Sequence, residues 1–498
     1  MSGTCFERYM TPIVSFWPMA AILVSLLGAL PILLSDRQPN LRESWTILIA
    51  LAKLTIVASL LPWILEGGSY VFTIAQVIPG VPIELRVDAL GMIFALVASC
   101  LWLFTSIYSI GYMRALDEHA QTRYFASFAV AISATLGIAF AGNLLTLYLF
   151  YEVLSLSTYP LVTHHQNAEA RTSGRKYLTY ILGTSIGLAL PAMLITYSIA
   201  GTLDFTTGGI LAGKASPEIL ALLVVLFLFG FAKAGLMPFH GWLPAAMVAP
   251  TPVSSFLHGV AVVKAGVFAI FRVIFHILGP ETLQTANLGS LITYIAAVTI
   301  LVASLVALTQ DSLKRRLAYS TIGQLAYMVL GAGMLSATGM LGGVMHLAMH
   351  AFGKITLFFC AGAIYVTSKK KNISQMNGLG KRMPITYLAF FLGSLSIIGM
   401  PPLGGFISKW NLLIGAVEGD QLVLIVVLLV SSLLNAAYFF PVFYRGFFMP
   451  APDGAEEGIK EAPLFCLIPL SVTALVSLAL FFFPDTLLQL ARMALGTW

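Results

Sequence analysis

Apolar runs of about 20 residues recur along the whole of this 498-residue chain. A helix of that length crosses the roughly 30 Å of hydrocarbon in a bilayer. Charged residues make up 10% of the chain, whereas an ordinary soluble domain has about 25%. We therefore predict an all-α polytopic membrane protein. The composition excludes a soluble enzyme, a nucleic-acid-binding protein and a secreted disulfide scaffold.

The apolar runs between polar breaks predict about fourteen membrane-spanning helices. The expected spans lie near 10–34, 45–66, 88–112, 122–141, 143–163, 177–200, 217–236, 252–277, 288–308, 317–336, 340–366, 384–416, 422–449 and 463–483. The segment 67–87 is interrupted by prolines, and we expect a loop or a short hairpin there.

The distribution of Lys and Arg predicts the orientation. Seventeen of them lie in loops after odd-numbered spans, and five lie on the opposite side. Because positive loops stay in the cytoplasm, we expect the odd-numbered loops there and both termini on the outer face of a bacterial inner membrane.

The chain has no sequence signature of a cofactor site. Its four cysteines are far apart, with no CxxC pair, so ligation of iron–sulfur, zinc or haem by cysteine is not expected. No GxGxxG, GxxxxGK[ST] or HExxH motif is present. We expect no cofactor, no metal and no catalytic or redox site in this chain.

A few charged residues lie inside predicted spans, where each charge costs on the order of 3 kcal/mol. These residues are Lys53, Lys233, Lys264, Lys354, Lys409 and Glu152. Burial favours the neutral form of a lysine, so such a group can lose and regain a proton. One glutamate cannot pair with five lysines, which favours proton carriage over static ion pairs. For Lys53 the two interpretations are equally good. Glu152 and Lys233 are the natural candidate pair.

Histidines extend this pattern. His346, His350 and Lys354 are spaced i, i+4, i+8 and so lie on one helix face, spanning about 12 Å. A proton relay is one interpretation; the alternatives are hydrogen bonds to neighbouring backbone or, less favoured, an i, i+4 metal pair. His258 precedes Lys264 by six residues, so a relay between them needs water or another helix.

Two spans are broken by proline and glycine, at KAGLMPFHGWLP (233–244) and GMPPLGGFISKW (399–410). Both contain M-P-x-x-G, and the breaking residues are Pro238, Gly241, Pro401, Pro402 and Gly404. Matched discontinuous helices indicate an ion pathway in a repeat-built transporter, whereas a simple proline kink is the alternative. We expect two five-helix repeats, at 122–277 and 288–449.

Several stretches resemble the antiporter-like subunits shared by Mrp-type multisubunit Na⁺/H⁺ antiporters, respiratory complex I and membrane-bound hydrogenases. They are FYEVLSLSTYPLV, KAGLMPFHGWLPAAM, PTPVSSFLHGVAVVKAGVF, DSLKRRLAYSTIGQLAYMVLG and HAFGKITLFFCAGAIY. The resemblance implies fourteen spans, two inverted five-span repeats with discontinuous helices 7 and 12, and a central chain of ionisable residues. It assigns the fifth-span glutamate to Glu152, the seventh-span lysine to Lys233, the eighth-span lysine to Lys264 with His258 before it, and the twelfth-span exit residue to Lys409.

Within that family the chain is most similar to the D-type subunit of the Mrp antiporters, through Lys409 and through THHQNAEARTSGRKY. The resemblance implies a proton-translocating component of a Na⁺/H⁺ antiporter that works with other hydrophobic membrane subunits. The alternatives are a proton-pumping component of a complex I-type oxidoreductase or hydrogenase, and a protein coupled to a cytoplasmic partner for inorganic carbon uptake. The sequence does not distinguish Na⁺ from K⁺ or from H⁺ alone.

Overall fold

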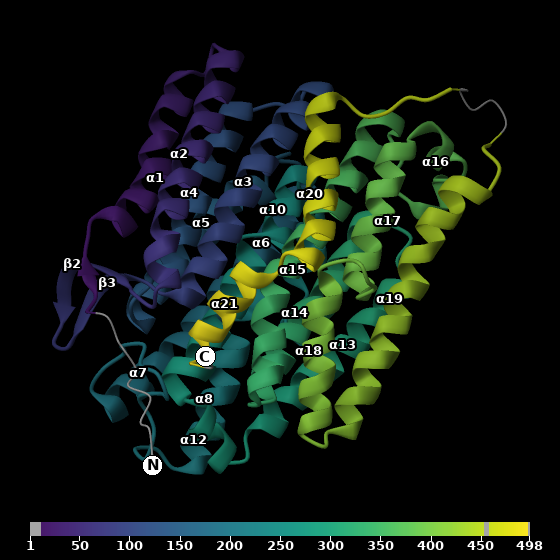
Figure 1. Ribbon diagram of the computed structural model, residues 1–498. Helices are drawn as coiled ribbons and strands as arrows, with labels where there is room; N and C mark the ends of the chain where they lie inside the picture. Colours follow the sequence, from purple (N-terminus) through teal and green to yellow (C-terminus); the bar gives the residue numbers. More distant parts are fainter. Residues whose placement is uncertain (1–10, 453–457, 497–498) are drawn as a thin grey trace.

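The computed structural model describes residues 11–452 and 458–496, apart from the side chains of Ile78 and His258. This part of the chain is a bundle of long helices with a small sheet at one corner (Figure 1). Helices α1 (Trp17–Leu34) and α2 (Pro39–Leu65) lie at one side, and α19 (Leu422–Phe448) lies at the opposite side.

The elements between α2 and residue 278, besides two strands, are α3 (Ala89–Ala115), α4 (Gln121–Ala139), α5 (Leu144–Val162), α6 (Ala168–Thr184), η1 (Ser185–Ala189), α7 (Leu190–Ala200), α8 (Pro217–Gly230), η2 (Ala232–Ala234), α9 (Trp242–Ala245), η3 (Ala246–Val248), α10 (Thr251–Gly259), α11 (Val262–Arg272) and η4 (Val273–Leu278). The remaining elements, besides α19, are α12 (Pro280–Thr285), α13 (Gly289–Thr309), α14 (Leu313–Gly333), α15 (Ala337–Ser368), η5 (Ile373–Gln375), α16 (Leu379–Arg382), α17 (Pro384–Ile398), α18 (Gly405–Glu418), α20 (Leu464–Phe482) and α21 (Asp485–Ala494).

Several helices begin where a polar side chain accepts a hydrogen bond from a free backbone amide of the first turn. Asp88, Asn143, Asn167 and Ser336 cap α3, α5, α6 and α15 in this way. Such caps satisfy donors that have no partner inside the helix, and they fix where the helices start.

The sheet contains β1 (Ile13–Val14), β2 (Tyr70–Ile78) and β3 (Val81–Val87). Strands β2 and β3 pair antiparallel, and β1 pairs in parallel with β2. The tight turn between β2 and β3 contains Gly80 with φ of +73°, a conformation that glycine adopts without strain. Of the two structures expected for 67–87, the chain forms the hairpin.

The starts of the first, second and sixth spans predicted from hydropathy are wrong, because the helices begin at Trp17, Pro39 and Ala168 and not near 10, 45 and 177. The first span does not begin near residue 10, because Ile13–Val14 pairs with β2 and the helix starts only at Trp17. In the sixth span, α6, η1 and α7 form one helical segment from Ala168 as far as Ala200. The eighth span agrees with the expected 252–277 as a segment, Thr251–Leu278, but within it α10 ends at Gly259 and α11 begins at Val262. Hydropathy measures apolar content, and both an apolar strand and a broken apolar helix satisfy it.

The predicted helical polytopic fold class is confirmed, with the small sheet as an addition. Eleven helical segments among the described residues are long and apolar enough to cross a membrane. Helices α8 and α17 are shorter apolar helices, and each precedes one of the expected breaks. Helix α14 is long but has three basic residues in its first turn. Helices α8, α14 and α17 lie in the three expected spans that the eleven segments do not cover. The total of fourteen spans stays a prediction.

Helix α15 lies at the centre of the second half. Its most apolar stretch is completely buried, and it packs against α10, α14, α17, α18 and α20. Polar side chains on α15 are therefore enclosed by other helices and not by lipid.

Candidate functional site

Three ionisable side chains of α15 lie inside this bundle. His346, His350 and Lys354 are each 0–1% exposed, and the rings of the two histidines lie 5.7 Å apart. A buried polar group must find a partner, so the contacts of these side chains define the site.

His350 contacts the lysine of the eighth span. The Nζ atom of Lys264 lies 2.6 Å from Nδ1 of His350. The other ring nitrogen of His350 has no hydrogen-bond partner in the described part of the chain. A lysine and an imidazole at this distance share one hydrogen bond, and either group can carry the proton.

Lys354 begins a continuous series of hydrogen bonds. Its Nζ donates to Oγ of Ser320 over 2.8 Å, and the hydroxyl of Tyr438 donates to the same oxygen over 2.8 Å. The Tyr438 hydroxyl lies 2.6 Å from the amide of Asn435, whose oxygen accepts from Nζ of Lys409 over 3.1 Å when the amide is oriented to satisfy all its neighbours. We call Lys354, Ser320, Tyr438, Asn435 and Lys409 the central polar chain.

His346 joins this chain through a side branch. Its Nε2 lies 3.0 Å from Oε1 of Gln324, and its Nδ1 lies 2.8 Å from Oγ of Ser408. The Gln324 amide nitrogen lies 3.0 Å from the Asn435 oxygen in the same orientation. Buried networks in which every member is satisfied are ordered and cooperative.

The first predicted helix break places Lys233 against the neighbouring helix α5. Lys233 lies in η2, just after α8 ends, and its Nζ donates to the backbone oxygen of Tyr151 and to Oγ of Ser155, both over 2.7 Å. The Trp242 indole donates to the carbonyl of Ala232, so a backbone group freed by the break is satisfied.

Close packing at a glycine joins this break to α11. A Cβ on Gly266 would lie 2.1 Å from the backbone nitrogen of Ala234. Only glycine permits that approach, and Lys264 is two residues away on the same helix. The hydrogen bonds of Lys233 go to α5 and that of Lys264 goes to His350, so a proton passing between the two lysines needs water or a side-chain movement.

Glu152 does not make the expected contact with Lys233. Both its carboxylate oxygens are buried, and neither has a hydrogen-bond partner among the described residues. It is near enough to Lys233 to act on it electrostatically, but the hydrogen bonds of Lys233 go to Tyr151 and Ser155. The two groups are neighbours and not an ion pair.

The second break separates α17 from α18 and contains Pro401, Pro402 and Gly404. Lys409 donates to the carbonyl of Ile398 at the end of α17 over 3.2 Å, where the helix dipole favours a cation. The Gly404 amide donates to the carbonyl of Ser477 on α20. Each break therefore lies beside a buried lysine.

The first break also faces a cavity. Pro238, His240 and Gly241 line it together with Lys176 of α6 and Tyr319 of α14. It lies on the face that the Lys and Arg distribution predicts to be cytoplasmic, and it gives water a route towards the break.

The far end of α11 carries a partly buried ion pair. The Arg272 guanidinium donates to both carboxylate oxygens of Asp88, over 2.6 and 2.7 Å. Burial opposes ionisation of Asp88, but Arg272 outweighs it and lowers the pKa of this carboxyl from 3.8 to about 2. The pair holds α11 to the start of α3.

The other two residues singled out in the sequence are Lys53 and His258. Lys53 is completely buried, and its Nζ has no hydrogen-bond partner in residues 11–452 and 458–496. It lies over the Trp102 ring at 5.5 Å. His258 lies in α10, and its side chain is outside the described part of the structure.

Sequence reasoning missed the uncharged members of the site, because Ser, Tyr, Asn and Gln are common in membrane helices. These residues are Tyr151, Ser155, Ser320, Gln324, Ser408, Asn435 and Tyr438. No sequence signal distinguishes them from the other neutral polar residues of these helices.

The chain resembles known proteins over nearly all its length. The family described as NADH:quinone oxidoreductase/Mrp antiporter, TM, matches residues 141–435, and that described as NADH-ubiquinone oxidoreductase (complex I), chain 5 N-terminus, matches residues 79–125. The N subunit of the NADH-quinone oxidoreductase of Desulforudis audaxviator is 31% identical over 82% of this chain and 83% of its own length.

A second relative is the A/B-type component of a probable K⁺/H⁺ antiporter of Rhizobium meliloti. It is 31% identical over 93% of this chain, which spans 46% of that protein. The chain also spans about half of the L subunit of the NADH-quinone oxidoreductase of Mycobacterium tuberculosis, with 35% identity over 65% of this chain.

Two solved structures share the fold. A chain of the Mrp complex from Dietzia sp. DQ12-45-1b superimposes with a TM-score of 0.85 and 22% identity, covering 97% of this chain and 96% of that one. A chain of an archaeal membrane-bound sulfane sulfur reductase gives a TM-score of 0.84 and 23% identity, covering 97% and 98%. The protein is therefore a multi-pass membrane protein of the NADH:quinone oxidoreductase/Mrp antiporter family.

Proposed function

We propose that this chain is the proton-translocating, D-like component of a multisubunit Na⁺/H⁺ antiporter. The observation that carries the proposal is the central polar chain, in which hydrogen bonds connect Lys354 to Lys409 through three uncharged side chains. The series connects the two lysines, and a proton crosses it when the Ser320 and Tyr438 hydroxyls reverse their hydrogen bonds and water carries the proton past the Asn435 amide, which does not itself transfer protons.

The proposed route begins at the cavity beside the first break. A proton passes from there to Lys233, then to Lys264 and His350 and along α15 to Lys354 and Lys409. Each lysine is buried, and burial makes the gain and loss of a proton comparable in free energy. Glu152 lies near Lys233, so a change in its charge shifts the proton affinity of that lysine.

We further propose the arrangement in the membrane. The five-helix units are 122–277 and 288–449, in inverted orientation, and each supplies one half of the route. The odd-numbered loops lie in the cytoplasm of a bacterial cell, and both termini lie outside. The chain has no catalytic or redox centre of its own, and its partners are other hydrophobic subunits.

The D-type assignment rests on Lys409 in the second break. The antiporter class is supported by the relative described as the A/B subunit of a probable K⁺/H⁺ antiporter. The fold shared with a chain of an Mrp complex agrees with the antiporter class. Na⁺ is the proposed cation, and the K⁺/H⁺ relative makes K⁺ the first cation to compare.

The second candidate function is redox-driven proton pumping. It is favoured by the 31% identity to the N subunit of a NADH-quinone oxidoreductase, of which this chain covers 83%. The route through this chain is the same in both cases, and only the energy source differs.

The test has two parts. The complex is purified from native membranes through a tag on this chain: an antiporter yields only other small hydrophobic subunits, whereas flavin, iron–sulfur or nickel proteins overturn the assignment in favour of the redox function. In everted vesicles, Lys233→Ala and Glu152→Ala should abolish cation-dependent proton flux while assembly is kept. Normal flux in either variant shows that the proposed route is wrong.

A further inference from the structure

Two loops on the face predicted to be cytoplasmic bring three histidines and a glutamate together. Glu118 and His119 lie in the loop between α3 and α4, and His164 and His165 lie between α5 and α6. One ligand atom each of Glu118, His119 and His165 lies within 4.8 Å of the others. We call these four residues the loop cluster; none of them belongs to the proposed proton route.

The distances suit a small metal ion. Oε2 of Glu118 lies 3.6 Å from Nδ1 of His165 and 3.7 Å from Nε2 of His164. Ligand atoms on a tetrahedral zinc ion lie about 3.4 Å apart, since the bonds are roughly 2.0–2.2 Å long. These pairs are too far apart for hydrogen bonds but close to the spacing that a shared metal imposes.

The surroundings of the His164 side chain also indicate a ligand at this position. Its side chain is completely buried, and neither ring nitrogen has a hydrogen-bond partner among the described residues. Its Nε2 faces the Glu118 carboxylate, and its ring lies 4.7 Å from that of His119. A buried imidazole without a partner is costly, and a metal bond to either nitrogen removes that cost.

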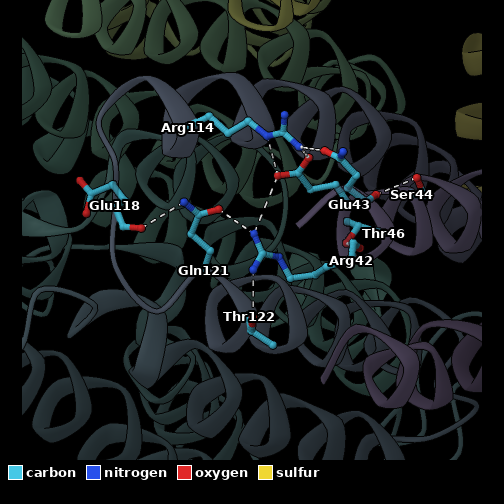
Figure 2. Close-up of polar contacts among 9 residues, drawn as sticks. Arg42, Glu43, Ser44, Thr46, Arg114, Glu118, Gln121 and Thr122 are labelled. Atoms are coloured by element: carbon cyan, nitrogen blue, oxygen red, sulfur yellow. Dashed lines mark hydrogen bonds and ion pairs between the residues drawn. The ribbon is translucent and has the colours of Figure 1, made fainter. Parts of the chain in front are cut away.

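The structure also holds Glu118 in place through its backbone. The Gln121 side chain donates to the backbone oxygen of Glu118 over 3.1 Å and accepts from Arg42, which also binds Thr122. Figure 2 shows this network on one side of Glu118 and the carboxylate pointing away from it. The α3–α4 loop is therefore anchored by its backbone, while the carboxylate remains available as a ligand.

We propose that the loop cluster binds one Zn²⁺ ion through Glu118, His119 and His165, and that His164, which lies just outside this group of mutually close ligand atoms, turns to become the fourth donor. The ion joins the α3–α4 loop to the α5–α6 loop. Glu118 and His165 also line a cavity together with Lys314 and Lys371, so the site is reached from solvent.

The donor set selects the metal. Three imidazoles and one carboxylate suit Zn²⁺, whereas Mg²⁺ and Ca²⁺ require mostly oxygen ligands. The nearby lysines repel any cation held by charge alone, and they act on His165 electrostatically. Binding therefore depends on bonds to nitrogen, which Mg²⁺ does not form well.

The test uses the intact complex purified through a tag on this chain, dialysed against metal-free buffer and then titrated with Zn²⁺. We expect the wild-type complex to contain about one more zinc ion per copy of this chain than the His119→Ala/His165→Ala variant. The affinity of the variant for Zn²⁺ should be at least about tenfold lower than that of the wild type, because two ligands are lost. Excess Mg²⁺ should not displace the ion. Substituting Co²⁺ should give the visible absorption bands of a four-coordinate site in the wild type alone.

The control is Glu169→Gln, because Glu169 lines the same cavity without belonging to the loop cluster; it should bind zinc like the wild type. Should the double variant fail to assemble, Glu118→Gln replaces it, since the backbone contact to Gln121 remains. Equal zinc content in the wild type and the variant would overturn the proposal, as would displacement of the ion by Mg²⁺. Neither result depends on transport, so the proposed function is tested separately.

Discussion

Tyr438→Phe is the most specific perturbation of the central polar chain, because it removes one oxygen atom and keeps the ring. The lost hydroxyl bridges Ser320 at 2.8 Å and Asn435 at 2.6 Å. Without it, those two side chains are separated by about 5 Å, or roughly two hydrogen-bond lengths. The space left by one oxygen is too small for a well-bonded water molecule, which needs at least about 10 Å³ and two or more polar partners.

The cost to stability is modest. Two hydrogen bonds are lost, each with a net contribution of about 1 kcal/mol. Ser320 still accepts from Lys354, so no charged group loses its partner. We expect the variant to assemble normally and its cation-dependent proton flux to fall at least tenfold, which corresponds to about 1.4 kcal/mol in the barrier.

The assay is the dissipation of a pH gradient in everted vesicles on addition of Na⁺ or K⁺, normalised to the amount of assembled complex. The matched control is Tyr387→Phe. Tyr387 is as completely buried as Tyr438, and its hydroxyl has no hydrogen-bond partner in the described structure. Wild-type flux in Tyr438→Phe, or an equal loss in both variants, would refute the reasoning.

Three other predictions concern packing and charge. Lys53→Met should keep full transport and raise the unfolding temperature of the complex, because a buried amine without a partner is replaced by an apolar chain of similar length; a loss of flux would show that Lys53 belongs to a proton route. Arg272→Met should lower the free energy of unfolding by about 1–3 kcal/mol, because Asp88 keeps its cap to Gly91 and some exposure but loses its cation, and adding Asp88→Asn should recover part of that loss in thermal unfolding. The ion pair contributes fully above the ordinary carboxyl pKa and is lost only as pH falls towards 2, so it should not affect the pH profile of transport near neutrality. Gly266→Ala should reduce the yield of assembled complex, since the new Cβ would lie 2.1 Å from the backbone of Ala234; normal yield on size-exclusion chromatography would contradict the packing described.

Much of the fold follows from hydropathy and from a few breaking residues. The apolar runs located the long helices, and proline with glycine located both broken helices, because these features act within a single segment. The strand at Ile13–Val14 and the interruption after Gly259 could not be predicted in this way. The first depends on pairing with β2, which comes more than 50 residues later.

Only the ionisable residues of the site could be predicted from the sequence. Buried lysines stand out in an apolar sequence, and the spacing of His346, His350 and Lys354 places them on one face. Their partners are neutral residues on other helices, and the sequence alone gives no reason to choose Ser320 or Tyr438 among many similar residues. The loop cluster was missed for a related reason, since its two pairs of residues meet only when the two loops are folded.

The central claim is that buried lysines on this route carry protons, and proton flux in proteoliposomes containing the purified complex tests it most directly. Lys354→Met is compared with Lys53→Met, because both lysines are completely buried and only Lys354 belongs to the central polar chain. The account predicts that cation-dependent proton flux is abolished in Lys354→Met and retained in Lys53→Met. Undiminished flux in an assembled Lys354→Met complex would contradict it.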